Sequence, residues 1–198
     1  MAALARDERV VAIGETGLDY DRVFSPILAQ LSNLRRNLEL AAETRKPAIL
    51  HCRSRAGERD AQDALLAEIR AFGSEPPAVV VHSFSGPVDY AEAMVELGAV
   101  ISISGLAFRK GEEATAEVVR LVPRAKLLVE TDSPYLPAPG APRDRNAPEW
   151  VRLTAAWVAE VRGEDVAAAG RGFVDAYERA FGRRQTTPAL DVVGRPRL

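Results

Sequence analysis

The sequence predicts an α/β fold built on a parallel sheet. Five short runs rich in β-branched residues alternate with longer segments whose apolar residues recur every three or four positions. The short runs are apolar almost throughout, as expected for strands whose two faces are both covered. From the residues alone, two architectures fit this pattern: an open doubly wound sheet and a (β/α) barrel.

The strands and helices follow one another in regular order. The first helix is expected to open with Ser25 as N-cap and Pro26 at the first helical position, while Gly73 and Gly98 end the next two helices. Strands are predicted at 10–14, 47–51, 78–82, 99–103 and 126–130, and later helices at about 59–72, 87–97, 112–122, 148–162 and 164–181.

Composition and charge exclude several classes of protein. The chain has 198 residues with 47% hydrophobic and 27% charged residues, which excludes a disordered chain and allows a sizeable core. A formal net charge of −2 argues against a broad basic surface for nucleic acid. The single cysteine, Cys52, excludes a disulfide framework and a multi-cysteine metal site.

The sequence also predicts a location and a domain organisation. No apolar run approaches the roughly 18 residues of a membrane span, and the first nine residues lack the apolar core of a secretory signal, so a cytoplasmic protein without a membrane partner is expected. Residues 1–182 are predicted to belong to a single domain. Residues 183–198 carry four arginines and one acidic residue, and are predicted to form a flexible basic tail.

Reactive side chains lie at the ends of the predicted strands. Glu15 follows the first strand, the only two histidines, His51 and His82, end the second and third, and Asp132 follows the fifth. Parallel α/β folds build their sites at these carboxyl ends. Two imidazoles and two carboxylates suit Zn²⁺ or Mn²⁺, whereas Mg²⁺ would rely on the carboxylates. The set therefore predicts a site for one or two divalent cations.

Each of these residues also has a structural interpretation. A histidine at a strand end can be a hydrogen-bonded structural residue, and Asp132 before Ser133 and Pro134 can be a turn or helix cap. Cys52 beside His51 could suggest a thiol nucleophile. Because adjacent residues of a strand point to opposite faces, Cys52 is instead expected to be a buried small apolar residue.

Six motifs, taken in order, resemble the TatD family of metal-dependent deoxyribonucleases. No single motif is specific, but their order and spacing fit the family from about residue 9 to residue 182. They are AIGETGLDY at 12–20, PAILHCR at 47–53, VHSFSG at 81–86, ISISG at 101–105, LLVETDSPYL at 127–136 and RN at 145–146.

The resemblance implies a (β/α)8 TIM barrel with a two-metal site. It implies that Glu15 bridges the metals, that His51 and His82 join Glu15 at one of them, and that Asp132 is a ligand of the other. Asp132 would also accept a proton from the attacking water, which makes Asp132 and Glu15 the predicted catalytic residues. Arg53 stands where a guanidinium could hold two phosphate oxygens, with a structural salt bridge as the alternative.

The chain departs from the family pattern at its start. Family members begin with a strand carrying a His-x-His pair and two further β/α units, whereas here the Gly-Glu motif already starts at Gly14. An incomplete barrel of about five β/α units is therefore expected, with an open sheet edge and a weak or empty second metal site. A mis-assigned start, a degenerate paralogue, or a second chain that supplies the missing strands would each explain the departure.

The function that the resemblance implies is divalent-metal-dependent hydrolysis of phosphodiester bonds. A TatD-type deoxyribonuclease is expected, with DNA as its substrate and no stable protein partner. The alternative is a truncated or degenerate, catalytically inactive remnant that needs a partner to fold. A third possibility keeps the enzyme class but changes the bond, since related scaffolds hydrolyse amides, lactones or phosphotriesters.

Overall fold

Five parallel strands form the centre of the fold in a computed structural model that describes residues 2–73 and 78–182. The tail predicted at residues 183–198 lies outside the described residues. Each predicted strand is present, four of them with bounds that differ by no more than two residues. The strands are β1 (Ile13–Asp19), β2 (Ala48–Arg53), β3 (Val79–Val81), β4 (Val100–Ile103) and β5 (Leu127–Val129).

The predicted helices are also present, and one short helix, α1, was not predicted. The first long helix has Pro26 as its N-cap without a side-chain cap, so the expected N-cap role of Ser25 is wrong by one residue. The helices are α1 (Ala2–Ala5), α2 (Ile27–Thr44), α3 (Asp60–Phe72), α4 (Val88–Glu96), α5 (Thr115–Leu121), α6 (Val151–Arg162) and α7 (Val166–Phe181), with 3-10 turns η1 (Gly105–Phe108), η2 (Arg124–Lys126) and η3 (Pro148–Trp150).

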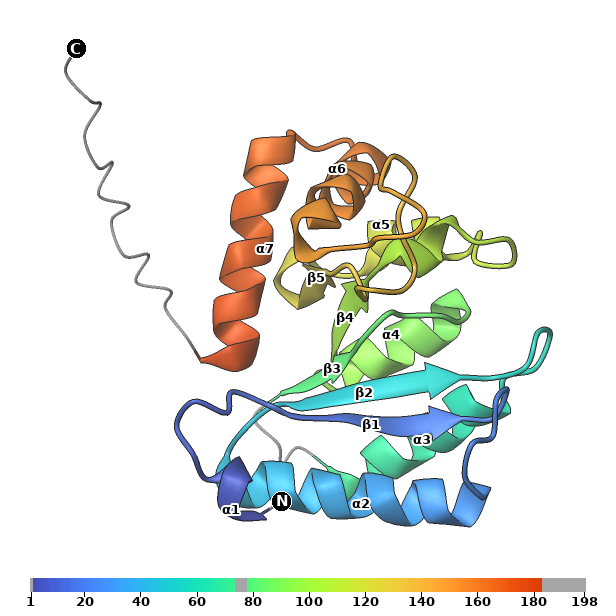
Figure 1. The fold of residues 1–198 in the computed structure, drawn as a ribbon, viewed down its shortest axis with the longest axis vertical. Coiled ribbons are helices and arrows are strands. Elements are labelled where there is room, and N and C mark those ends of the chain that lie inside the picture. The colour runs from blue at the N-terminus through green and yellow to red at the C-terminus, as the bar shows by residue number, and fades with distance from the viewer. Residues whose placement is uncertain (1, 74–77, 183–198) are drawn as a thin grey trace.

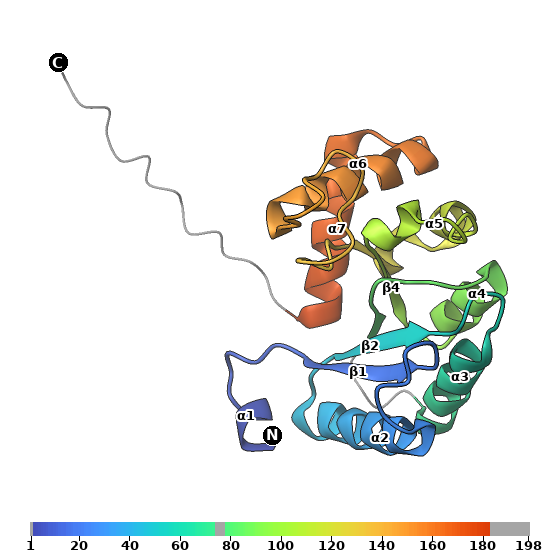
Figure 2. The same ribbon diagram turned by 45° about the vertical axis from the view of Figure 1, so that its right-hand side comes forward.

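The strand order decides between the two architectures that the sequence left open. The strands lie in the order β1-β2-β3-β4-β5, each parallel to its neighbour (Figure 1). A doubly wound sheet reverses its strand order at a switch point, and this sheet does not. With right-handed crossovers, sequential order places the connecting helices on one side. Figure 2 shows α2, α3 and α4 following one another around that side, as in a barrel wall.

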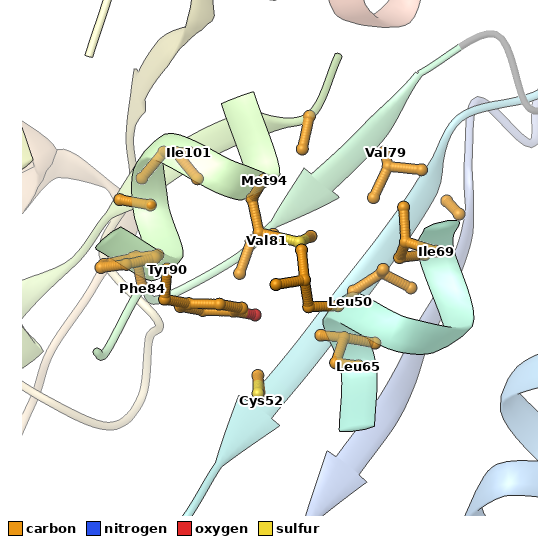
Figure 3. Close-up of a cluster of buried hydrophobic side chains, with 14 of the residues drawn as sticks. Leu50, Cys52, Leu65, Ile69, Val79, Val81, Phe84, Tyr90, Met94 and Ile101 are labelled. Carbon is orange, nitrogen blue, oxygen red and sulfur yellow. The ribbon is translucent and has the colours of Figure 1, made fainter. Parts of the chain in front are cut away.

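Both faces of the central strands are covered. On one face Leu50 and Cys52 of β2 point toward α3 and α4, where they meet Leu65, Tyr90 and Met94 (Figure 3). On the other face a second cluster joins the strands to α7. Its buried members are Val80, Val100, Leu128, Ala176 and Ala180. Cys52 is only 6% exposed, so the expectation that it is a buried apolar residue is confirmed.

The first strand differs most from its prediction, because β1 runs over Ile13–Asp19 instead of 10–14. Glycine normally weakens strands, yet Gly14 and Gly17 both lie within this one. At Gly17 a side chain is impossible because its Cβ would lie 2.0 Å from the His51 carbonyl oxygen of β2. Glu15 is therefore held within a strand and not on the loop that follows it.

None of the helices in the described ranges has the length and apolar character needed to cross a membrane.

Candidate functional site

Three of the predicted ligands come together from three neighbouring strands. Glu15 lies in β1, His51 in β2 and His82 directly after β3, and their ligand atoms lie within 4.8 Å of one another. The Glu15 Oε1 atom is 3.1 Å from His51 Nδ1 and 2.8 Å from His82 Nε2. The two imidazole centroids are 5.7 Å apart. One carboxylate thus faces two rings that come from different strands.

Strand register explains why residues so far apart in sequence meet here. Gly17 of β1 pairs with His51 of β2, and Glu15, two residues earlier, lies where the β1–β2 register is irregular, between Ile13 and Thr16. Leu50 pairs with Val81, and the His82 amide donates to the Leu50 carbonyl over 3.0 Å. The parallel order of β1, β2 and β3 therefore brings Glu15, His51 and His82 side by side.

Each histidine has a second carboxylate behind it. Asp19 Oδ2 lies 3.3 Å from His51 Nε2, and Glu130 Oε1 lies 3.2 Å from His82 Nδ1. The Ser102 hydroxyl donates to the other oxygen of Glu130 over 2.8 Å. Carboxylates in this position fix the tautomer and orientation of metal-binding histidines. The nitrogen of each ring that faces Glu15 is thus the one available to a cation.

The charges of the cluster reinforce one another. Hydrogen bonds from His51 and His82 lower the pKa of the Glu15 carboxyl well below its usual range. Burial opposes the charged form of His82, but the hydrogen bonds to Glu130 and Glu15 outweigh it and raise the His82 pKa to about 10. The carboxylates thus supply a strongly negative environment in which protons or a cation can be held.

Asp132 and Arg53 line the same pocket without joining the three-residue cluster. The pocket has a volume of about 570 Å³ and also contains Glu15, His51 and His82. Burial raises the pKa of the Asp132 carboxyl. Arg53 makes no ion pair with any carboxylate in the described ranges, so its salt-bridge alternative finds no support there. The catalytic and phosphate-binding roles of these residues stay predictions.

The donor set fits one divalent cation. Two imidazole nitrogens and one carboxylate oxygen within 4.8 Å match the ligands of Zn²⁺ or Mn²⁺ sites, and the three residues line the pocket. Within residues 2–73 and 78–182, no group of three or more potential ligands includes Asp132. A second cation would therefore depend on carboxylates alone.

Sequence reasoning did not identify Asp19, Glu130 or Ser102 as members of the site. Asp19 and Glu130 lie inside the quoted motifs, but the sequence of a motif does not indicate which side chain a carboxylate contacts. Their roles depend on which histidine nitrogen each carboxylate reaches, and this follows from strand register and side-chain rotamers. His51 and His82 were identified by their position at the ends of predicted strands. The same criterion could have identified Glu130 as a member of the site, because it directly follows β5.

Comparisons with known proteins agree with the geometry. The family model "TatD related DNase" matches residues 1–182. A "3'-5' ssDNA/RNA exonuclease TatD" from Erwinia billingiae is 40% identical over 174 residues, which cover 85% of this chain and 64% of the relative. An "uncharacterized metal-dependent hydrolase YcfH" from Escherichia coli is 35% identical over 179 residues, which cover 90% of this chain and 65% of that relative.

Solved structures show the same fold. The TatD homologue YJJV from Escherichia coli K12 matches with a TM-score of 0.78 and 32% identity, over 92% of this chain and 68% of that one. A TatD family hydrolase from Entamoeba histolytica matches with a TM-score of 0.76 at 22% identity, over 88% of this chain and 64% of that one. The chain spans somewhat less than two thirds of the length of the curated relatives described above.

Proposed function

The chain belongs to the TatD family, and from this premise we propose that it is a divalent-metal-dependent phosphodiester hydrolase, a TatD-type deoxyribonuclease. The observation that carries the proposal is the cluster of Glu15, His51 and His82 at one end of the sheet. A purely structural histidine pair would not require a shared carboxylate and a second carboxylate behind each ring.

Glu15, His51 and His82 would hold the cation. When bound there, a divalent cation supplies positive charge that offsets the negative charge developing on the phosphoryl oxygens. Asp132 lies in the same pocket and, because burial raises its pKa, is a stronger proton acceptor than an exposed aspartate when ionised. The Arg53 guanidinium can orient the phosphate with two parallel hydrogen bonds.

A strand end of DNA or RNA fits this site better than a wrapped duplex. Relatives carry the name 3'-5' ssDNA/RNA exonuclease, and the net charge of −2 is unlike that of a protein that covers a long stretch of backbone. The metal identity, the cytoplasmic location and the absence of a stable protein partner stay predictions from the sequence.

The test is hydrolysis of an end-labelled single strand in Mg²⁺ or Mn²⁺. We expect stepwise shortening that chelation stops and that His82→Ala lowers by at least about a hundredfold. Glu39→Gln, an exposed change on α2, is the matched control and should leave the rate unchanged.

Other results would point to the alternatives. A folded chain without metal-dependent turnover would contradict the proposal and favour an inactive remnant. Turnover of an amide, lactone or phosphotriester without nuclease activity would keep the metal chemistry and change the substrate.

A further inference from the structure

One exposed aromatic ring stands at the mouth of the metal pocket. Tyr135 is 71% exposed and lines the same pocket as His82 and Asp132. A single exposed aromatic residue needs no explanation by itself. Two further observations indicate a role for this one: its backbone is fixed, and three arginines of the same pocket form no ion pair within the described ranges.

The backbone that carries Tyr135 is held from several sides. The buried Asn146 side chain donates to the Thr131 carbonyl over 2.7 Å and also to the Tyr135 carbonyl. The Tyr135 amide donates to the Asp132 carbonyl over 2.8 Å. The next carbonyl, that of Leu136, packs so closely on Gly105 that a Cβ there would lie 1.8 Å from it. The ring is therefore presented to solvent by a loop that is already fixed. Ligand binding then carries no entropy cost for ordering this loop.

Three arginines line the pocket that Tyr135 also lines, together with the carboxylates of Glu15 and Asp132. Arg22, Arg53 and Arg143 line the pocket with Tyr135, and none of them forms an ion pair with a carboxylate of the described ranges. Arginines without ion pairs in one pocket with an exposed aromatic ring are typical of a single-strand binding surface, where bases stack on rings and cations contact phosphates.

We propose that Tyr135 is the stacking platform for a nucleobase of a single-stranded nucleic acid whose backbone enters the pocket beside Arg143 and Arg53. This inference rests on the proposed function, because it assumes a phosphodiester strand at the metal site. Bases within a duplex already stack on their neighbours, so the platform favours a single strand or a frayed end over an intact duplex. Every base has a π-face, so the platform does not select a base sequence.

The test compares two oligonucleotides of about 12 nucleotides, oligothymidylate and a strand of the same length without bases. Binding is measured by fluorescence anisotropy in Ca²⁺, and cleavage separately in Mg²⁺ or Mn²⁺. Tyr135→Ala should weaken binding of oligothymidylate by about tenfold or more and leave binding of the abasic strand unchanged. Tyr135→Phe should bind like the unaltered chain, Tyr135→Leu should lose affinity, and Val174→Ala on α7 is the distant control.

The outcomes separate this inference from the proposed function. If Tyr135→Ala weakens both strands equally, or weakens neither, the platform is wrong even when cleavage proceeds. If oligothymidylate binds better than the abasic strand through Tyr135 but no divalent cation supports cleavage, the platform holds and the proposed hydrolase function fails.

Discussion

Each histidine of the cluster is oriented by a carboxylate on the side away from Glu15. For His82 the contact continues through Glu130 to the Ser102 hydroxyl, so three strand ends share one line of hydrogen bonds. The His82 side chain is only 11% exposed, which leaves the ring few other orientations. The contact with Glu130 therefore leaves the other ring nitrogen of His82, Nε2, facing Glu15.

From this contact we expect Glu130→Gln to weaken divalent-cation binding by about tenfold to a hundredfold, because the His82 ring loses its charged partner. Isothermal titration of Mn²⁺ or Zn²⁺ measures the affinity directly, without reliance on turnover. Glu68→Gln is the matched control, since Glu68 pairs with Arg35 on the surface. Equal affinities of Glu130→Gln and the unaltered chain would contradict the positioning role.

The neighbouring residue, Cys52, should be inert in the folded protein. Burial raises the pKa of the Cys52 thiol to about 12, so at pH 8 the reactive thiolate is nearly absent. We expect a thiol-specific chromogenic disulfide to label Cys52 at pH 8 only after unfolding in guanidinium. Rapid labelling of the native chain would show that the β2 side chains do not pack against α3 and α4 as described.

Single residues also show where sequence reasoning succeeds and where it stops. Strand alternation separates His51 from Cys52 because the period of a strand is two residues and needs no tertiary information. Strand alternation does not show which side chain the Asp19 carboxylate contacts. Asp19 pairs in register with Arg53, yet its carboxylate reaches back to His51, and this depends on side-chain rotamers.

At the scale of elements, β1 is the strand that local rules misplace. The predicted strand ended at Gly14, but the two glycines allow β1 to continue to Asp19 and to approach the β2 backbone so closely that no side chain fits between them. The other four strands contain no glycine and were located to within two residues. Propensity therefore fails where a close backbone contact between strands has replaced side-chain packing.

The close approach of β1 and β2 predicts a large stability difference between two glycine substitutions. Gly17→Ala should lower the free energy of unfolding by about 3 kcal/mol or more, because Gly17 has φ +144° and its Cβ would meet the His51 carbonyl oxygen. Gly57 also has positive φ (+84°), but its Cβ would meet nothing within 4 Å.

Gly57→Ala is thus the matched control and should cost only about 1 kcal/mol. Guanidinium unfolding followed by circular dichroism gives both values. Similar costs for the two substitutions would mean that β1 does not approach β2 as closely as described.

On the scale of the whole molecule, the sequential parallel sheet converts sequence distance into proximity. Glu15, His51 and His82 are separated by 36 and 31 residues, yet they meet because each strand lies beside its sequence neighbour. The proposed cation position would thus join β1, β2 and β3 across the sheet. The Asp132 carboxyl, 50 residues further on, shares the pocket through the loop after β5.

A cation that joins three strands should stabilise the whole fold, because it binds the folded chain and finds no such site in the unfolded one. At a free Mn²⁺ or Zn²⁺ concentration about a hundredfold above Kd, the expected gain is about 2.7 kcal/mol. For a chain of this length, that gain raises Tm by about 5 to 10 °C. Calorimetric scans with and without the cation measure the shift.

Two substitutions then assign the shift to particular residues. His51→Ala removes a member of the cluster and should abolish most of the increase in Tm, whereas Asp132→Asn should retain most of it because Asp132 lies outside the three-residue group. If His51→Ala keeps the full shift, the cation binds elsewhere and the cluster is not a metal site. If Asp132→Asn loses the shift together with His51→Ala, the cation is held across the pocket as far as the loop after β5, and the ligand set has four members instead of three.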